Sequence, residues 1–257
     1  RQSSSTGKFE LSGAGSQLIV SGSEDIGITG VGTFNQTGGT HEVTGNMNIA
    51  SGSSANLSGG SLSVASLQNA GTFDFTGGTF KAVTTSTNSG TLAVGKDVIF
   101  QGGIANNVGG TLTGSGTVQG NVENSGTLAP GNSPGTFTIN GDYTQTDDGT
   151  LVAELGGYEK GVTYDWVNIN GTATLAGWLD IEIYDSSALD ATSADFTLLT
   201  AFAGVAGTFD NIKYSAGLVS TEWTLLYSDT DFDTVIDSVI LEYRHDNGGG
   251  APVPAPN

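Results

Sequence analysis

Short runs of alternating apolar and polar residues cover the chain, with small residues between them. Examples are Thr72–Phe75 and Gly120–Glu123. Alternation with a period of two turns one side of a strand inward, while Gly and Asn supply the corners with positive φ. The pattern therefore predicts many short β-strands joined at tight corners. Long helices are disfavoured, because each Gly in a helix interior costs about 1 kcal/mol.

The strand pattern repeats along the first half of the chain. Gly-Thr or Gly-Ser, followed in most cases by an apolar residue, recurs at Gly32, Gly60, Gly71, Gly78, Gly90, Gly110, Gly116, Gly126 and Gly135. From Gly71 to Gly90 is 19 residues, from Gly90 to Gly110 is 20, and from Gly110 to Gly126 is 16. Short strands and Gly corners at such a period are typical of a parallel β-solenoid.

In a solenoid, each coil stacks on the next at roughly 4.8 Å and buries its apolar side against its neighbours. We therefore expect a continuous core of Leu, Val, Ile and Phe, with Thr and Ser outside and Asn stacked in ladders at the corners. A β-sandwich with frequent turns is the alternative, but it gives no reason for the recurring Gly-Thr register.

Composition divides the chain into two unequal halves. The 257 residues include 41 Gly and no Cys, and the net charge is −19. Residues 130–257 carry 19 of the 26 acids, all three Trp and all seven Tyr. We expect an all-β protein with solenoid repeats in 1–139, an acidic, aromatic-richer β-rich cap or sandwich in 140–246, and a Gly/Pro tail in 247–257.

The charge and the hydropathy pattern exclude some function classes. An acidic surface argues against binding nucleic acid, whose phosphates require basic residues. No run of roughly 18 apolar residues exists to span a membrane as a helix. Without Cys, the chain has neither disulfides nor a thiolate zinc site.

Two stretches resemble a known family. Gly32–His41 followed by Asn56–Leu62 is similar to the repeats of secreted bacterial proteins related to autotransporter passengers, many of which carry a PEP-CTERM sorting tail. Gly126–Phe137, which contains Pro-Gly-Asn-Ser-Pro-Gly-Thr, followed by Gly141–Gln145, resembles the C-terminal part of such passengers. The resemblance implies a β-helix displayed outside the cell, with an adhesive or structural role.

The C-terminal tail departs from that family. A PEP-CTERM tail has Pro-Glu-Pro, an apolar span and an Arg cluster, whereas Ala255 stands here at the Glu position. Either the chain is cut near this point during sorting or the tail is a flexible linker end. We expect a protein that is processed after export and located outside the cell or on a bacterial cell surface.

The ends of a solenoid expose unpaired strand edges, and such edges invite pairing with another chain. Residues 140–246 provide a candidate cap at one end. At the other end, Lys8–Leu11 and Gln17–Val20 read as ordinary strands with no cap. The sequence therefore predicts a non-catalytic structural or adhesive protein that self-associates as a homopolymer, stacking head to tail into a fibre or surface layer.

Catalytic groups are sparse. Neither His41 nor His245 has the Ser and acid neighbours of a catalytic triad, and we expect His41 at an outward repeat position. Asp180 and Glu182 alternate with apolar residues and so share one face of a strand, the solvated one. The leading rival is a polysaccharide-acting β-helix enzyme, which would need a groove lined by convergent acids and a base.

Calcium is the metal that the acidic residues favour. Asp229, Asp231 and Asp233 alternate, with Asp237 beyond them, as carboxylates do in oxygen-ligand loops. The EF-hand pattern is not satisfied, because Thr234 and Ile240 occupy the positions of its Gly and Glu. The alternative is an acidic turn before a strand at Val235–Tyr243, with no cofactor.

Aromatic residues raise a further possible partner. Tyr158, Tyr164, Trp166, Trp178 and Trp223 could stack against the rings of extracellular glycans, which would make the protein a polysaccharide-binding adhesin. Trp178 and Trp223, however, stand next to apolar strand residues, so we expect both in the core.

Overall fold

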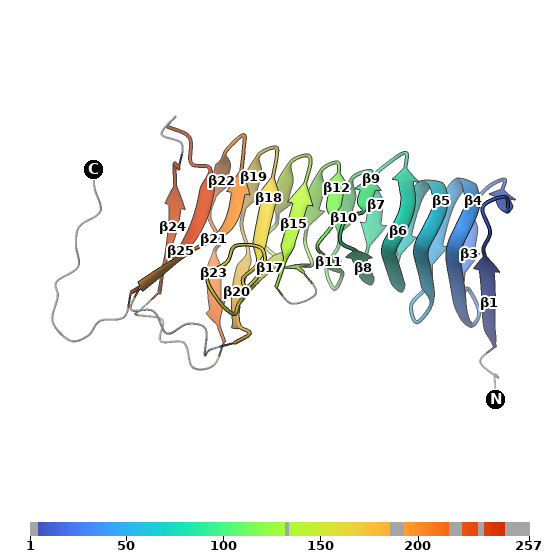
Figure 1. Ribbon diagram of the computed structural model, residues 1–257, viewed down its shortest axis with the longest axis horizontal. Helices are drawn as coiled ribbons and strands as arrows, with labels where there is room; N and C mark the ends of the chain where they lie inside the picture. Colours follow the sequence, from blue (N-terminus) through green and yellow to red (C-terminus); the bar gives the residue numbers. More distant parts are fainter. Residues whose placement is uncertain (1–4, 132–133, 186–192, 216–222, 231–233, 245–257) are drawn as a thin grey trace.

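The computed structural model describes residues 5–131, 134–185, 193–215, 223–230 and 234–244. Within these ranges the chain is all-β, and its strands stack into an elongated parallel β-solenoid (Figure 1). The fold class predicted from the Gly-Thr repeat is confirmed. Parallel pairing between successive coils rules out the β-sandwich, whose sheets are antiparallel. No described segment forms a helix that could cross a membrane.

Three columns of parallel strands form the faces of the solenoid, and β4 (Val31–Ile49) and β5 (Ser54–Asn69) bend through all three. β6 (Thr72–Ala82) belongs to the first two. Face 1 further contains β1 (Thr6–Leu11), β8 (Thr91–Val94), β11 (Thr111–Gly114), β14 (Thr127–Pro130), β17 (Thr150–Leu155), β20 (Trp178–Ile183) and β23 (Asn211–Tyr214).

Face 2 further contains β2 (Gln17–Val20), β9 (Ile99–Gln101), β12 (Thr117–Gln119), β15 (Thr136–Ile139), β18 (Trp166–Ile169) and β21 (Ser193–Ala201). Face 3 contains β3 (Glu24–Ile26), β7 (Ser86–Asn88), β10 (Ile104–Asn106), β13 (Val122–Asn124), β16 (Tyr143–Gln145), β19 (Ala173–Leu175) and β22 (Val205–Gly207).

The Gly-Thr motifs work as the sequence predicts. At Gly71-Thr72-Phe73, the Gly lies at a corner, Thr72 faces solvent and Phe73 is fully buried. The inward residues form one apolar cluster from the first coil to the last. Rings stack between coils in this cluster, and the centroids of Phe80 and Phe100 lie 4.4 Å apart. The stack thus buries apolar surface that no single coil could cover.

Consecutive glycines form the corner between faces 1 and 2 in the early coils. Gly39, Gly60 and Gly78 have φ of 74°, 80° and 83°. A Cβ atom at Gly60 would lie 2.4 Å from the carbonyl oxygen of Gly39 in the coil below. The corner therefore needs Gly for two reasons, the left-handed backbone and the close approach of the adjacent coil.

A ladder of buried amides runs inside face 3. The side-chain Nδ2 of Asn69 donates to Oδ1 of Asn88 (2.8 Å), Asn88 donates to Asn106 (2.7 Å), and Asn106 donates to Asn124 (2.8 Å). Each of the four also donates to the carbonyl of a face 1 Thr in the next coil. The ladder predicted at the corners is confirmed, and its hydrogen bonds hold the coils in register.

The solenoid continues through the second half of the sequence. β15 pairs in parallel with β18, and β18 pairs with β21, so the coils cross the expected change of character at residue 139. The stack then ends in an antiparallel pair, β24 (Trp223–Ser228) and β25 (Ser238–Arg244). β25 also pairs antiparallel with β21 and covers its edge. A β-rich C-terminal cap is therefore present; the tail predicted at 247–257 lies outside the described residues.

Candidate functional site

Among the described residues, no strand covers the N-terminal end of the solenoid. β1 pairs with β4 along one edge, and a hollow of about 340 Å³ opens beside it, lined by the apolar residues Phe9, Leu18, Ile26 and Phe34 among others. The Phe9 side chain is 49% exposed and its ring stacks on Phe34, with centroids 5.6 Å apart and planes 5° apart. The strands predicted at Lys8–Leu11 and Gln17–Val20 are confirmed as β1 and β2.

A buried histidine lies just behind this open end. The expectation that His41 faces outward is wrong, because its exposure is 0%. Register explains this, since His41 stands in the inward column between Leu18 and Leu62. Its Nε2 lies 2.9 Å from Oε2 of Glu24, and its ring contacts Phe34. His245, the second histidine, lies outside the described residues.

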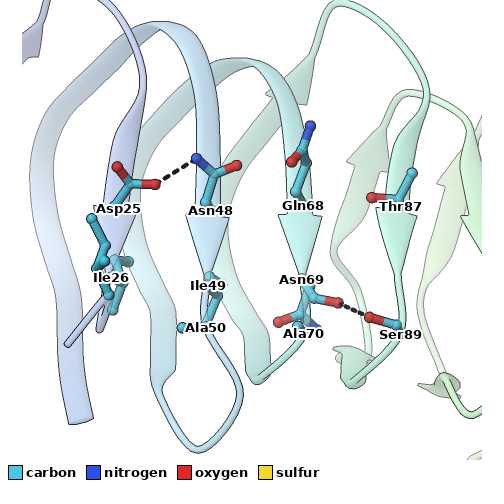
Figure 2. A pocket seen from close by; sticks show the side chains of 11 residues that line it. Asp25, Ile26, Asn48, Ile49, Ala50, Gln68, Asn69, Ala70, Thr87 and Ser89 are labelled. Carbon is cyan, nitrogen blue, oxygen red and sulfur yellow. Dashed lines mark hydrogen bonds between the residues drawn. The ribbon is translucent and has the colours of Figure 1, made fainter. Parts of the chain in front are cut away.

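The hollow in Figure 2 lies on face 3 near the same end and measures about 340 Å³. Polar side chains from four successive coils, Asp25, Asn48, Gln68 and Thr87, stand in one outward column beside it. Nδ2 of Asn48 donates to Oδ1 of Asp25 at 2.6 Å. Such a column offers hydrogen-bonding groups at the coil spacing, which suits an extended polar ligand more than a small substrate.

Face 1 presents a longer column of hydroxyl groups. Strand pairing aligns seven Thr and Ser residues, one in each of seven consecutive coils: Thr33, Ser54, Thr72, Thr91, Thr111, Thr127 and Thr150. Trp178 and Asn211 occupy the same position in the next two coils. The expectation that Trp178 is a core residue is wrong, because its side chain is 42% exposed at the end of this column. Trp223 is 6% exposed, so the core prediction is confirmed for that residue.

Trp178 borders a shallow hollow of about 260 Å³ whose other lining residues are Asp148, Thr150, Asp180 and Lys213. Asp180 and Glu182 share the outward side of β20, as expected. The Lys213 ammonium contacts Asp180, and this hydrogen bond raises the pKa of Lys213. A lysine with a raised pKa stays protonated near neutral pH, so it serves as a hydrogen-bond donor and not as a base.

Only two of the four proposed calcium ligands fall within the described residues, since Asp231 and Asp233 lie outside them. Oδ2 of Asp229 accepts from the backbone N–H of Thr234, and both carboxylate oxygens of Asp237 accept from the Thr230 hydroxyl. Among the described residues, no group of three or more acidic or His side chains is arranged to hold a metal. The calcium site stays a prediction.

Sequence reasoning missed one buried carboxylate. Asp165 is 2% exposed, and its two oxygens accept from the backbone N–H groups of Gly135 (2.7 Å) and Glu154 (2.9 Å). Burial raises its pKa to about 7, against the lowering effect of these two hydrogen bonds. The side chain ties Gly135, which precedes β15 on face 2, to Glu154 of β17 on face 1, a structural role.

The chain was also compared with known proteins. No family model matches it, and no curated protein matches it significantly.

Proposed function

We propose that this protein is a non-catalytic structural or adhesive protein of the bacterial cell surface that associates with itself through the open N-terminal end of its solenoid. The observation that carries the proposal is the difference between the two ends. At the C-terminal end β25 covers the edge of β21. At the N-terminal end, β1, β2 and β3 each pair, within the described chain, on one side only.

Open strand edges favour association because they present unpaired backbone N–H and C=O groups. Here the edges surround a hollow that is lined by apolar residues and by the charged side chains of Lys8, Glu24 and Asp25, so a partner would gain backbone hydrogen bonds and bury Phe9 in one contact. The stacked coils and the buried amide ladder between them make the body suitable as a rigid spacer. The extracellular location rests on the resemblance to exported passengers.

Association with itself can be tested directly on the purified chain. Analytical ultracentrifugation and negative-stain electron microscopy over a wide range of protein concentration should show end-joined rods whose fraction grows with concentration. If the protein sediments as discrete monomers at every concentration, the proposal is wrong.

The exposed Trp178 favours a second candidate function, binding of a neutral polysaccharide. A sugar ring can stack on the indole, while Asp148, Asp180 and Lys213 offer hydrogen bonds to hydroxyl groups. The ligand would be uncharged, since a net charge of −19 repels acidic polymers. The protonated Lys213 can donate hydrogen bonds to the hydroxyl groups of a bound sugar, which fits a binding role.

Affinity electrophoresis through gels containing a soluble neutral β-glucan tests this second function. We expect retardation of the wild type and its loss in Trp178→Ala, with Tyr184→Ala as a matched control, because Tyr184 is 62% exposed and does not line the hollow. Equal migration of the wild type with and without glucan would contradict binding. Release of reducing sugar ends would instead support the enzyme.

A further inference from the structure

We propose that the partner at the open end is a second copy of this chain, docked head to head so that the two β1 strands pair antiparallel about Phe9. This inference rests on the proposed self-association and names its geometry. The two copies would be related by a twofold axis, so each would offer the same surface to the other.

The edge of β1 is suited to receive a strand. All six of its residues, Thr6 to Leu11, pair with β4 on one side, and five of the six are exposed. Of its two inward apolar residues, Leu11 is buried, whereas Phe9 lies over the end of the core and remains half exposed. A second Phe9 directly opposite would extend the stack that Phe9 makes with Phe34 and remove apolar surface from water.

The charges on β1 are complementary to themselves. Lys8 and Glu10 flank Phe9 on the outward side, with side chains 60% and 62% exposed and 2.6 Å apart. In an antiparallel pair centred on Phe9, Lys8 of each copy lies opposite Glu10 of the other. Two opposite-charge pairs therefore form across the twofold axis, and opposite charges on directly opposed residues stabilise a strand pair.

The other two edges are compatible with the same symmetry. A twofold axis through β1 brings β2 of each copy against β3 of the other, because these strands follow β1 in order around the coil. β2 is Gln-Leu-Ile-Val and carries no charge, so it opposes no like charge to Glu24 and Asp25 of β3. Leu18 and Ile26, which line the hollow, would meet across the joint.

Head-to-tail stacking, the arrangement expected from the sequence, meets an obstacle at the C-terminal end. On face 2 the edge of β21 is occupied by β25, and on face 3 the N–H of Val205 in β22 donates to the carbonyl of Ile236. On face 1, β23 extends the column of β1, so a head-to-tail contact would place Glu10 next to Lys213. A substitution at Lys213 should therefore affect head-to-tail association and leave head-to-head association unchanged.

The test is a charge exchange measured by sedimentation. Lys8→Glu alone and Glu10→Lys alone each oppose like charges and should weaken dimerisation about tenfold. An equimolar mixture of these two variants should form heterodimers as readily as the wild type forms homodimers, and Lys8→Glu combined with Glu10→Lys in one chain should dimerise again. Only a twofold contact predicts this recovery.

Lys81→Glu is the matched control, because it makes the same charge change at an exposed position of face 2. Tryptophan fluorescence verifies folding, since all three Trp lie in the second half of the sequence. If the single variants dimerise like the wild type, or if mixing them restores nothing, the head-to-head geometry is wrong. Loss of association in Lys213→Glu alone would establish head-to-tail stacking, and a wild type that is always monomeric would refute self-association itself.

Discussion

The two ends of this solenoid meet the same physical problem in different ways. A stack of parallel strands leaves unpaired edges at its first and last coils. At the C-terminal end the chain reverses direction, and β25 runs antiparallel to β21 and covers that edge, with a bulge between Thr197 and Leu199. At the N-terminal end β1 continues the parallel pattern, and the inward side chain of Phe9 lies over the core while 49% exposed. Within the described residues, the chain itself thus covers the edge of face 2 at the C-terminal end, although β23 on face 1 pairs on one side only, whereas all three strands of the first coil keep an uncovered edge.

The strongest test of this difference is a matched pair of core truncations. Leu241 in β25 is fully buried, whereas Leu18 in β2 is only partly buried. We expect Leu241→Ala to lower the free energy of unfolding by about 4 kcal/mol and Leu18→Ala by about 1 kcal/mol in dilute protein. Urea unfolding followed by tryptophan fluorescence and by hydrogen exchange measures both. Equal losses would mean that the two ends are closed to the same extent.

The pH dependence of stability separates the C-terminal half from the N-terminal end. The pKa of Asp165 is about 7 in the folded chain, against an ordinary value of 3.8. Between these values the unfolded state has lost the proton that the folded state keeps, so stability falls as pH rises and levels off above 7. At 1.36 kcal/mol per pH unit, the loss from about pH 4.5 to pH 7.5 is about 3 kcal/mol.

Asp165→Asn is the control for this prediction. It removes the titrating group, so urea midpoints should fall less steeply over the same pH range, and any slope that remains belongs to the general acidity of the chain. A variant with the slope of the wild type would show that Asp165 does not cause the dependence.

Within face 3, the amide ladder distinguishes the later coils from the first two. The inward column contains Ile26 and Ile49 in the first coils and Asn from Asn69 to Asn124. Asn106→Ala would remove the ladder hydrogen bond from Asn88 Nδ2 and leave Asn124 Oδ1 without the Asn106 donor, at a cost of about 2 kcal/mol. Thermal unfolding measures the loss. Asn107→Ala is the control, because Asn107 is the exposed neighbour of Asn106, and it should change stability by less than about 0.5 kcal/mol. Similar losses in both variants would show that the ladder hydrogen bonds do not stabilise the fold.

The smallest effect belongs to Phe9. Because its side chain is half exposed, Phe9→Ala should destabilise dilute monomer by about 1 kcal/mol or less. The same change should abolish association at high concentration if the head-to-head contact forms. Sedimentation and urea unfolding on the same samples compare the two effects, and a large loss in the monomer would show that Phe9 belongs fully to the intramolecular core.

Much of the fold follows from local pattern. The Gly-Thr repeat identified the corners, the outward Thr column and the inward apolar column, because each depends only on neighbouring residues and on strand alternation. The same alternation, applied strictly, would have placed His41 inward with Val43 and Trp178 outward with Asp180. Both errors arose because polar His was expected outside and aromatic Trp inside, without regard to the alternation along the strand.

Other features had no local signal. Asp165 is one of 19 acids in the second half, and its burial depends on backbone N–H groups 30 and 11 residues away. The pairing of β25 with β21 joins segments about 45 residues apart in reversed direction, which composition alone cannot predict. The candidate sites therefore depended more on three-dimensional structure than the solenoid itself did.

The number of residues in a coil varies widely in this solenoid, but each coil adds the same increment to the length of the solenoid. From Ser54 to Thr72 is 18 residues and from Trp178 to Asn211 is 33, yet each interval advances the stack by a single strand spacing of roughly 4.8 Å. Tandem duplication of one coil would therefore lengthen the rod by a fixed increment and copy one hydroxyl and one amide without altering either terminus. Through such duplications, evolution could adjust the reach of this protein in equal steps.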